Sequence, residues 1–245
     1  MLVTIITVVY NNQSTIERTI RSVMDQTYPE IEYLVIDGKS TDGTVAVAEQ
    51  FVDTFNAQEG RSMRVISEKD NGMYDALNKG ARLASGELVG QINADDWYEK
   101  DAVEKMVDFY QKENYDVAWG DIVVHKRSGK MMKRAKIGKT LWTTSGFCHP
   151  AMFSKKSILL EFPYALENMC DDFEFVTRVH LAKKKICTLN QTISNFSFGG
   201  MSTKKNFKEA LGRVNTSYSV YKKHGMSRFY WFHRFAMEMA KYILG

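Results

Sequence analysis

Two adjacent carboxylates, Asp95 and Asp96, closely follow the short apolar segment 87–92 in the stretch ELVGQINADDWY. Like charges side by side repel each other, so a cation or solvent must compensate them. Magnesium and manganese prefer oxygen ligands and are often held by one or two carboxylates together with substrate phosphates. The pair therefore indicates either a divalent-metal site or a solvated turn in which one Asp caps the next helix.

The elements that position this acidic pair follow from the apolar pattern of the first half of the chain. Apolar runs rich in β-branched residues predict strands, whereas apolar residues at intervals of three and four predict helices. A capping-box pattern, Ser14-x-x-Glu17, introduces the first helix. The predicted strands cover 2–9, 31–36, 63–67 and 87–92, and the predicted helices cover 16–27, 42–55, 73–84 and 100–112.

This alternation predicts an α/β fold with a doubly wound, mostly parallel central sheet flanked by helices. In open sheets of this kind, ligands bind in the crevice beyond the carboxyl ends of the strands. Three polar clusters fall there, namely Tyr10 with Asn11, then Asp37, and then Asp95-Asp96. Acidic groups from separate strands would converge on one place, which favours the metal-site interpretation over a solvated turn.

Beyond Tyr115 the pattern is mixed rather than strictly alternating. The predicted elements are a hairpin of 116–124 and 130–135, a helix over 173–184, and a strand and loop over 186–198. No internal repeat, low-complexity segment or Pro/Gly-rich linker interrupts the chain. We therefore expect one catalytic domain over 1–205 and a helical C-terminal extension over 206–245.

The composition is that of a soluble globular protein, with 44% hydrophobic and 25% charged residues among 245. Cys148, Cys170 and Cys187 form no CxxC pair, which argues against a disulfide framework or a zinc site. A reducing, cytoplasmic setting fits this cysteine usage. The apolar N-terminus lacks a basic leader, and no run of 18 apolar residues predicts a membrane span.

Positive charge is concentrated at the C-terminal end. From Met201 onward there are nine Lys or Arg and two Glu, a net +7, whereas the whole chain carries +4. On a helix over 226–245, Arg234, Glu238 and Lys241 form one narrow polar stripe among apolar and aromatic residues. Such a helix must bury apolar surface against the catalytic domain, a second subunit or a bilayer interface. The basic excess favours peripheral contact with an anionic membrane, and a partner helix in a homo-oligomer is the alternative.

Two other nucleotide-binding folds are disfavoured. No G-x-G-x-x-G follows the first predicted strand, which argues against a dinucleotide fold. The fragment Gly138-Lys139-Thr140 suggests a P-loop, but Lys133 stands where that motif needs its first glycine.

Several motifs together carry a family resemblance. They are ITVVYNN (6–12), LVIDGKSTDGT (34–44), SEKDNGMYDALNKG (67–80) and ASGELVGQINADDWY (84–98). In this order they resemble the inverting family 2 glycosyltransferases of GT-A fold. Three further motifs, FCHPAMF (147–153), CDDFEFVTRV (170–179) and NFSFGGMS (195–202), resemble the bacterial branch that builds colanic acid, O-antigen and related surface polysaccharides.

The resemblance implies a nucleotide-sugar site on the first half of the chain. Tyr10 and Asp37 would line the nucleoside pocket, with Asp37 on the base or ribose. Asp70 and Asp75 would border the ribose and donor sugar. Gly38 stands where some relatives have an acid, which places the base contact on Asp37.

The resemblance also implies a divalent metal, Mn²⁺ or Mg²⁺, at the D-x-D-like stretch Ala94-Asp95-Asp96. Asp96 would be the metal ligand and Asp95 a ribose or supporting contact, with the reverse order as the alternative. Asn93 stands where many members carry a further Asp, so the ligand set is thinner than theirs.

The second acidic pair would supply the base. Inverting transfer needs a carboxylate that takes the proton of the acceptor hydroxyl, and Asp172 aligns with the family's catalytic base. Asp171 is the second candidate, and either residue alternatively caps the helix beginning near Phe173. His149, in the CHPAMF stretch, is either an acceptor- or sugar-facing residue or a structural one.

Three further positions have two interpretations each. The loop at Gly199-Gly200, with its basic run 202–205, either closes over the diphosphate or is a surface turn. Trp97 and Trp142 either stack on sugar faces or belong to the core.

The resulting hypothesis is an inverting transfer of a sugar from a UDP-sugar to a hydroxyl of a lipid-linked glycan, at the inner face of the cytoplasmic membrane. One rival is a sugar nucleotidyltransferase of similar fold, but 10–13 (YNNQ) is not the Gly-rich basic loop of that class. The other is a non-catalytic nucleotide- or nucleic-acid-binding protein, for which no recognised nucleic-acid motif is present.

Overall fold

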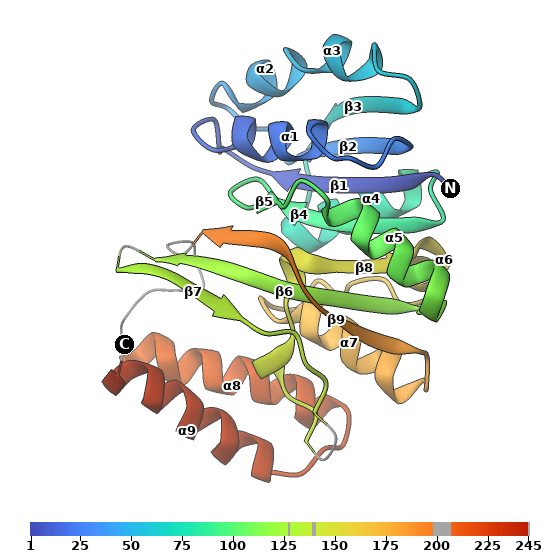
Figure 1. The fold of residues 1–245 in the computed structure, drawn as a ribbon. Helices are drawn as coiled ribbons and strands as arrows, with labels where there is room; N and C mark the ends of the chain where they lie inside the picture. The colour runs from blue at the N-terminus through green and yellow to red at the C-terminus, as the bar shows by residue number, and fades with distance from the viewer. Residues whose placement is uncertain (127, 139–140, 198–206, 245) are drawn as a thin grey trace.

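The computed structural model describes residues 1–126, 128–138, 141–197 and 207–244 (Figure 1). The strands are β1 (Val3–Val9), β2 (Ile31–Asp37), β3 (Arg61–Ser67), β4 (Leu88–Asn93), β5 (Trp97–Tyr98), β6 (Val117–Lys126), β7 (Gly129–Lys133), β8 (Met152–Lys155) and β9 (Ile186–Ser197). The α-helices are α1 (Ile16–Met24), α2 (Thr44–Glu49), α3 (Val52–Asn56), α4 (Met73–Leu83), α5 (Ala102–Glu113), α6 (Lys156–Glu161), α7 (Asp171–Leu181), α8 (Phe207–Lys223) and α9 (Phe229–Leu244). Two 3₁₀ turns, Thr144–Gly146 and His149–Ala151, lie between β7 and β8.

The strands form one sheet in the order β3-β2-β1-β4-β8-β6-β9-β5, with β7 paired to β6. The strands β3, β2, β1 and β4 are parallel, whereas β8 runs antiparallel to both β4 and β6. Every residue of β1 and β2 is buried, as expected for parallel strands covered on both faces. Figure 1 shows α1 and α5 on one side of the sheet and α4 and α6 on the other. The predicted α/β architecture is confirmed, including its mixed second half.

Two local predictions were wrong. Ser14 does not cap the first helix, because α1 begins at Ile16 after Thr15 and has no side-chain cap. The Thr15 hydroxyl instead donates to Ala94 O at 2.8 Å, which ties the start of α1 to the acidic turn after β4. The single helix expected over 42–55 is two short helices, α2 and α3, although Gln50 and Phe51 between them keep right-handed helical dihedrals.

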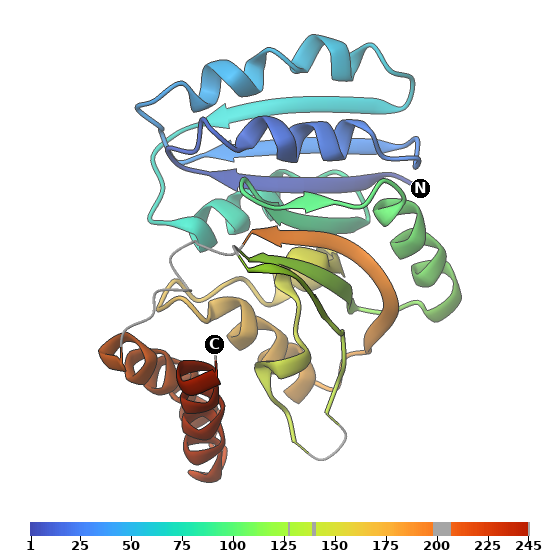
Figure 2. The ribbon, with the colours of Figure 1, turned by 60° about the vertical axis from the view of Figure 1, so that its left-hand side comes forward.

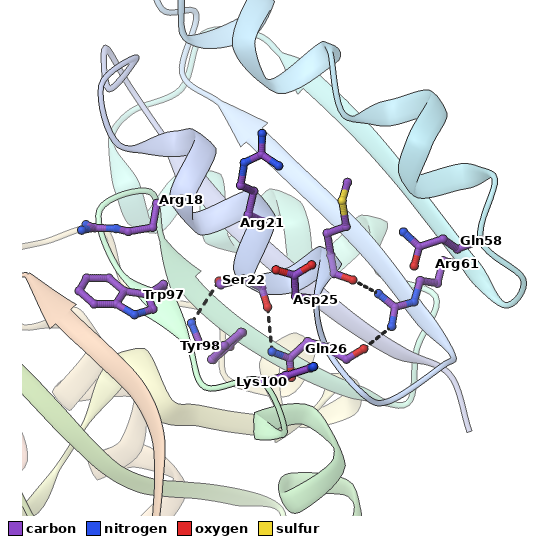
Figure 3. Close-up of a pocket in the computed structure, with 11 residues that line it drawn as sticks. Arg18, Arg21, Ser22, Asp25, Gln26, Gln58, Arg61, Trp97, Tyr98 and Lys100 are labelled. Atoms are coloured by element: carbon purple, nitrogen blue, oxygen red, sulfur yellow. Dashed lines mark hydrogen bonds between the residues drawn. The ribbon is translucent and has the colours of Figure 1, made fainter.

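A cavity of about 680 Å³ lies along α1 (Figure 3). The arginines that line it are already engaged: Arg61 donates to Met24 O at 2.6 Å and to Gln26 O at 2.5 Å, and Arg21 pairs with Glu17. Arg61 also begins β3, so this end of the cavity lies at the amino end of the strands. Its other end, at Arg18 and Trp97, lies beside the acidic turn. None of the acids predicted to do chemistry lines the cavity, which argues against it as the active site.

Arg61 holds the carboxyl end of α1 and the turn that follows it. We expect Arg61→Met to lower the free energy of unfolding by about 2 kcal/mol, because four carbonyl oxygens lose a charged donor. Urea unfolding measures the change. The matched control is Arg21→Met in the same cavity, whose exposed ion pair contributes less than about 0.5 kcal/mol. Equal losses in the two variants would contradict this account.

Candidate active site

The carboxyl ends of four parallel strands meet at one edge of the sheet. Asp37, the last residue of β2, pairs in register with Val9 of β1 and Ser67 of β3. Asn93, the last residue of β4, pairs with Val8. The structure therefore brings together the three polar clusters that the sequence placed at strand ends.

Asp37 is completely buried at this edge. Its carboxylate accepts hydrogen bonds from the Ser40 backbone N–H at 2.9 Å, the Ser40 hydroxyl at 2.5 Å and the Ser67 hydroxyl at 2.6 Å. The loop after β1 joins the same cluster, because the Asn11 N–H donates to Ser40 Oγ at 2.8 Å. Tyr10 stands beside this cluster with 63% of its surface exposed. Asp37 thus organises the loops, and Tyr10 offers a free ring.

Gly38 and Asp70 approach each other closely. A Cβ atom at Gly38 would lie 2.8 Å from Asp70 Oδ2, so any side chain at position 38 would displace this carboxylate. Asp70 therefore occupies the space that a side chain at position 38 would need. Asp75, in the first turn of α4, accepts from the Asn71 N–H at 3.0 Å and orders the loop that carries Asp70.

Asp96 is buried without full compensation. The Ser197 N–H donates to its Oδ1 at 2.9 Å, whereas its Oδ2 has no hydrogen-bond partner among the described residues. Burial and the neighbouring Asp95 raise the pKa of Asp96 well above its usual range. Burial also raises the pKa of Asp95, which is only half-buried. A cation beside Oδ2 would offset both the burial of this carboxylate and its repulsion from Asp95.

Arg18 fastens the acidic turn but does not neutralise Asp96 directly. Its Nη2 donates to Asp95 O at 2.7 Å and to Ser197 Oγ at 2.9 Å. Its guanidinium lies 3.9 Å above the Trp97 ring, and His125 packs on the same indole at 4.6 Å. Figure 3 shows Arg18 lying alongside Trp97. Trp97 therefore packs against protein side chains, and no local pattern in the sequence indicated the role of Arg18.

The donor set at this turn fits a hard divalent cation. Both Asp96 Oδ2 and Asn93 Oδ1 are buried oxygens without a hydrogen-bond partner among the described residues. Across all the residues that the structure describes, no group of three or more His, Cys, Asp or Glu could hold a metal by itself. Magnesium and manganese sites that are completed by substrate phosphates have such incomplete protein ligand sets.

The two acids at the start of α7 differ in their surroundings. Asp171 is completely buried and accepts hydrogen bonds from the Glu167 and Asn168 N–H groups at 2.7 and 3.2 Å. Asp172 is half-buried, and the Phe173 N–H donates to its Oδ1 at 2.7 Å. Asp171 thus holds the preceding turn, which leaves Asp172 as the candidate base.

Removal of the Asp171 carboxylate should affect stability first. We expect Asp171→Ala to lower the free energy of unfolding by about 2 kcal/mol, because two backbone N–H groups lose their acceptor. Thermal and urea unfolding check this, with Asp172→Ala as the matched control on the neighbouring position. If Asp172→Ala is destabilised as much as Asp171→Ala, Asp171 does not have the special role of holding the turn before α7.

His149 lies deep beside Asp172. Its side chain is buried, and its Nε2 has no hydrogen-bond partner among the described residues. Burial lowers the pKa of His149, although the charge of Asp172 acts in the opposite direction. The imidazole is therefore a neutral group near the candidate base, in a place where it can donate or accept one hydrogen bond.

Tyr74 connects the two halves of the site. It lies in the first turn of α4, after the loop that carries Asp70, and its hydroxyl donates to Met169 O at 3.1 Å, three residues before Asp172. Burial and the charge of Asp172 raise the pKa of Tyr74, so the hydroxyl stays protonated. The donor-side loop and the loop before α7 are thus held side by side.

Two other predicted features lie outside this site. Trp142 is buried against His180, with the rings 4.1 Å apart, and its Nε1 donates to Thr177. It belongs to the core and presents no face to a sugar. The Gly199-Gly200 loop and its basic run 202–205 lie outside the described residues.

The sequence matches a known family over most of its length. The model of glycosyl transferase family 2 aligns with residues 4–178, which contain every acid discussed above. The chain belongs to glycosyl transferase family 2. The resemblance inferred from the motifs is thereby confirmed at the level of the family, but not for a colanic acid or O-antigen branch.

Named relatives are bacterial glycosyltransferases. The chain is 27% identical over 202 residues to a PGL/p-HBAD biosynthesis glycosyltransferase of Mycobacterium bovis (strain BCG / Pasteur 1173P2), with 80% of this chain and 77% of that protein covered. It is 36% identical over 108 residues to the putative teichuronic acid biosynthesis glycosyltransferase TuaG of Bacillus subtilis (strain 168). That match covers 44% of this chain and 41% of TuaG.

Solved structures share the fold. S. aureus TarS 1–349 in complex with UDP-GlcNAc superposes with a TM-score of 0.70 at 16% identity, covering 98% of this chain and 72% of that one. The mannosyltransferase PcManGT from Pyrobaculum calidifontis, in complex with GDP-Man and Mn²⁺, gives 0.68 at 18% identity, covering 91% and 63%. The GT-A fold expected from the sequence is confirmed, and the chain is a family 2 glycosyltransferase.

Proposed function

We propose that this glycosyltransferase moves a sugar from a UDP-sugar to a hydroxyl of a lipid-linked glycan, with inversion at the anomeric carbon. The observation that carries the proposal is the buried Asp96, whose Oδ2 lacks a partner, at the strand-end edge that also gathers the nucleoside-side residues. A half-buried carboxylate, Asp172, lies on the other side of the Tyr74 link.

The donor would lie along the strand ends. Tyr10 would pack on the base, and Asp37 and Asp70 would order the loops that meet the nucleoside. Asp75 would border the donor sugar from the start of α4. UDP is proposed as the nucleotide because a structural neighbour, TarS, is in complex with UDP-GlcNAc.

The diphosphate would meet the acidic turn. Asp96, with Asn93 and Asp95 beside it, would hold Mn²⁺ or Mg²⁺, which when bound neutralises the negative charge of the departing diphosphate. Asp96 Oδ2 is proposed as the direct ligand because this oxygen is buried and has no hydrogen-bond partner among the described residues. Arg18 keeps the turn in place through the Asp95 carbonyl.

The acceptor would approach Asp172. Its carboxylate takes the proton as the acceptor oxygen attacks the anomeric carbon, and the sugar–phosphate bond breaks on the opposite face. His149, neutral and next to Asp172, would orient the base or the acceptor hydroxyl. Asp171 would act only through the turn that it holds.

The acceptor class and location are part of the same proposal. A lipid-linked glycan is proposed, as in the assembly of colanic acid, O-antigen and similar surface polysaccharides. The reaction would take place in the cytoplasm at the inner face of the membrane. The catalytic unit would comprise residues 1–205, with 206–245 as an appended helical segment.

A panel of nucleotide sugars tests the function. Purified protein is incubated with UDP- and GDP-sugars, with and without manganese, and the released nucleoside diphosphate is measured. We expect UDP release that requires the cation and rises with a hydroxyl acceptor. Pyrophosphate formation from UTP and a sugar phosphate would indicate a nucleotidyltransferase instead, and tight UDP binding without any release would indicate a binding protein.

A further inference from the structure

The last helix, α9, turns charged residues toward the protein and apolar residues toward solvent, the opposite of an ordinary surface helix. Glu238 is 3% exposed and accepts from Arg213 of α8 at 3.0 Å and from Arg234 at 3.3 Å. Arg234 also donates to Thr144 Oγ1 at 2.7 Å. Two members of the polar stripe expected from the sequence, Arg234 and Glu238, therefore face inward.

The outward face of α9 is apolar. Phe229 and Phe232 are 58% and 64% exposed, and Met237 is 37% exposed. Ala236 and Ala240 are exposed as well. Positions 229, 232, 236 and 240 recur at helical spacing, so they form one continuous stripe. A surface helix normally turns such a stripe toward the core.

The reversed orientation is fixed by packing against the rest of the molecule. Tyr230 stacks on Tyr221 of α8 with ring centroids 4.2 Å apart, and Trp231 Nε1 donates to Asn215 at 2.9 Å. Tyr221 in turn contacts Phe173 of α7 at 5.6 Å. Rotation of α9 to hide its phenylalanines would break these contacts and bring its ion pairs to the surface.

A basic side chain borders the apolar stripe. Arg228, immediately before Phe229, is exposed. The segment from Met201 onward carries a net +7. Figure 1 places the α8–α9 hairpin at the opposite end of the molecule from α2 and α3, and Figure 2 shows it projecting from the sheet domain. Aromatic side chains beside cations match the headgroup region of an anionic bilayer.

We propose that the outward face of α9 docks on the surface of an anionic membrane, with Phe229 and Phe232 inserted and Arg228 on the lipid headgroups. In the described part of the chain no helix can span a membrane, so α9 would lie in the interface. The inference rests on the proposed function, because membrane docking would bring the enzyme to a lipid-linked acceptor.

Vesicle cosedimentation of the full chain tests the proposal. We expect binding to vesicles of phosphatidylcholine with phosphatidylglycerol, and little binding to phosphatidylcholine alone. Phe229→Gln with Phe232→Gln should lower the partition coefficient at least about tenfold, because two apolar rings no longer insert. The matched control is Leu160→Gln with Leu181→Gln, which removes two side chains that are 47% and 48% exposed on α6 and α7. Binding by the control should equal that of wild type.

The charge of Arg228 is tested separately. Arg228→Gln should weaken binding to the anionic vesicles by about fivefold, and added salt should reduce the difference. Thermal unfolding verifies that all variants remain folded. Equal binding by wild type and the phenylalanine variant would overturn the proposal.

A second copy of the chain is the competing occupant. Self-association predicts that sedimentation without lipid shows a wild-type dimer and that the phenylalanine variant is monomeric. That result, together with no binding of the wild-type dimer to vesicles, would overturn membrane docking. Manganese-dependent UDP release in lipid-free solution reports the proposed function independently. Absence of vesicle binding by the wild-type chain, with its UDP release intact, would reject this inference alone.

Discussion

Asp172→Asn is expected to lower kcat by about a thousandfold while UDP affinity stays within about twofold of wild type. The amide preserves the shape of the side chain and the acceptor for the Phe173 N–H, but it cannot take a proton from the acceptor hydroxyl. Asp172 lies on α7, apart from the strand-end residues assigned to the nucleotide. The two measurements are single-turnover kinetics and calorimetry with UDP.

Glu161→Gln is the control for this experiment. It removes a carboxylate from an exposed ion pair with Lys184 and should leave both turnover and UDP binding unchanged. Wild-type turnover in Asp172→Asn would show that another group is the base. His149 would then be the first alternative, because it is a buried imidazole whose pKa is affected by the charge of Asp172.

The second large effect is expected at Asp96. Asp96→Asn should weaken manganese-dependent UDP binding by about a hundredfold and leave metal-free UDP binding unchanged. The amide Oδ1 can still accept from the Ser197 N–H, so the turn is retained while the ionised oxygen is lost. Asp95→Asn should have a smaller effect of about tenfold, because Asp95 is less buried and its backbone carbonyl already binds Arg18.

Stability should change in the opposite direction from function. Burial raises the pKa of Asp96, so at a pH above the pKa of this group in the unfolded chain, either its buried charge or its uptake of a proton makes the metal-free fold less stable. Asp96→Asn removes this cost and should not lower the unfolding temperature without metal. Calorimetry measures the manganese-dependent affinity of Asp96→Asn and Asp95→Asn for UDP. A larger loss of affinity in Asp95→Asn would reverse the assignment of the two acids.

The sequence predicted the parallel half of the fold because each of its signals is local. Runs such as 31–36 are apolar at every position except Glu32, and parallel topology then brings Asp37 and Asn93 to one edge without further information. The acidic turn at Asp95-Asp96 followed from the same argument. Its likeness to the family motif supplied the assignment of roles.

Other features depend on contacts between residues far apart in the chain, which no local pattern records. The capping box failed because Thr15 bonds to Ala94, 79 positions away, and Ser14 is not needed. The polar stripe of α9 was visible in the sequence, but its inward direction depends on Arg213 and Thr144. The family motif favoured Asp172 over Asp171, but the hydrogen bond that ties Asp171 to the turn at Glu167 could not be predicted from the sequence.

A crystal structure with UDP and manganese tests the central claim most directly. The account predicts an anomalous manganese peak at Asp96 Oδ2, bridged to the diphosphate, with the uracil near Tyr10 and Asp37 and an open approach to Asp172. Manganese bound away from Asp96, or a nucleotide in the cavity along α1, would contradict it.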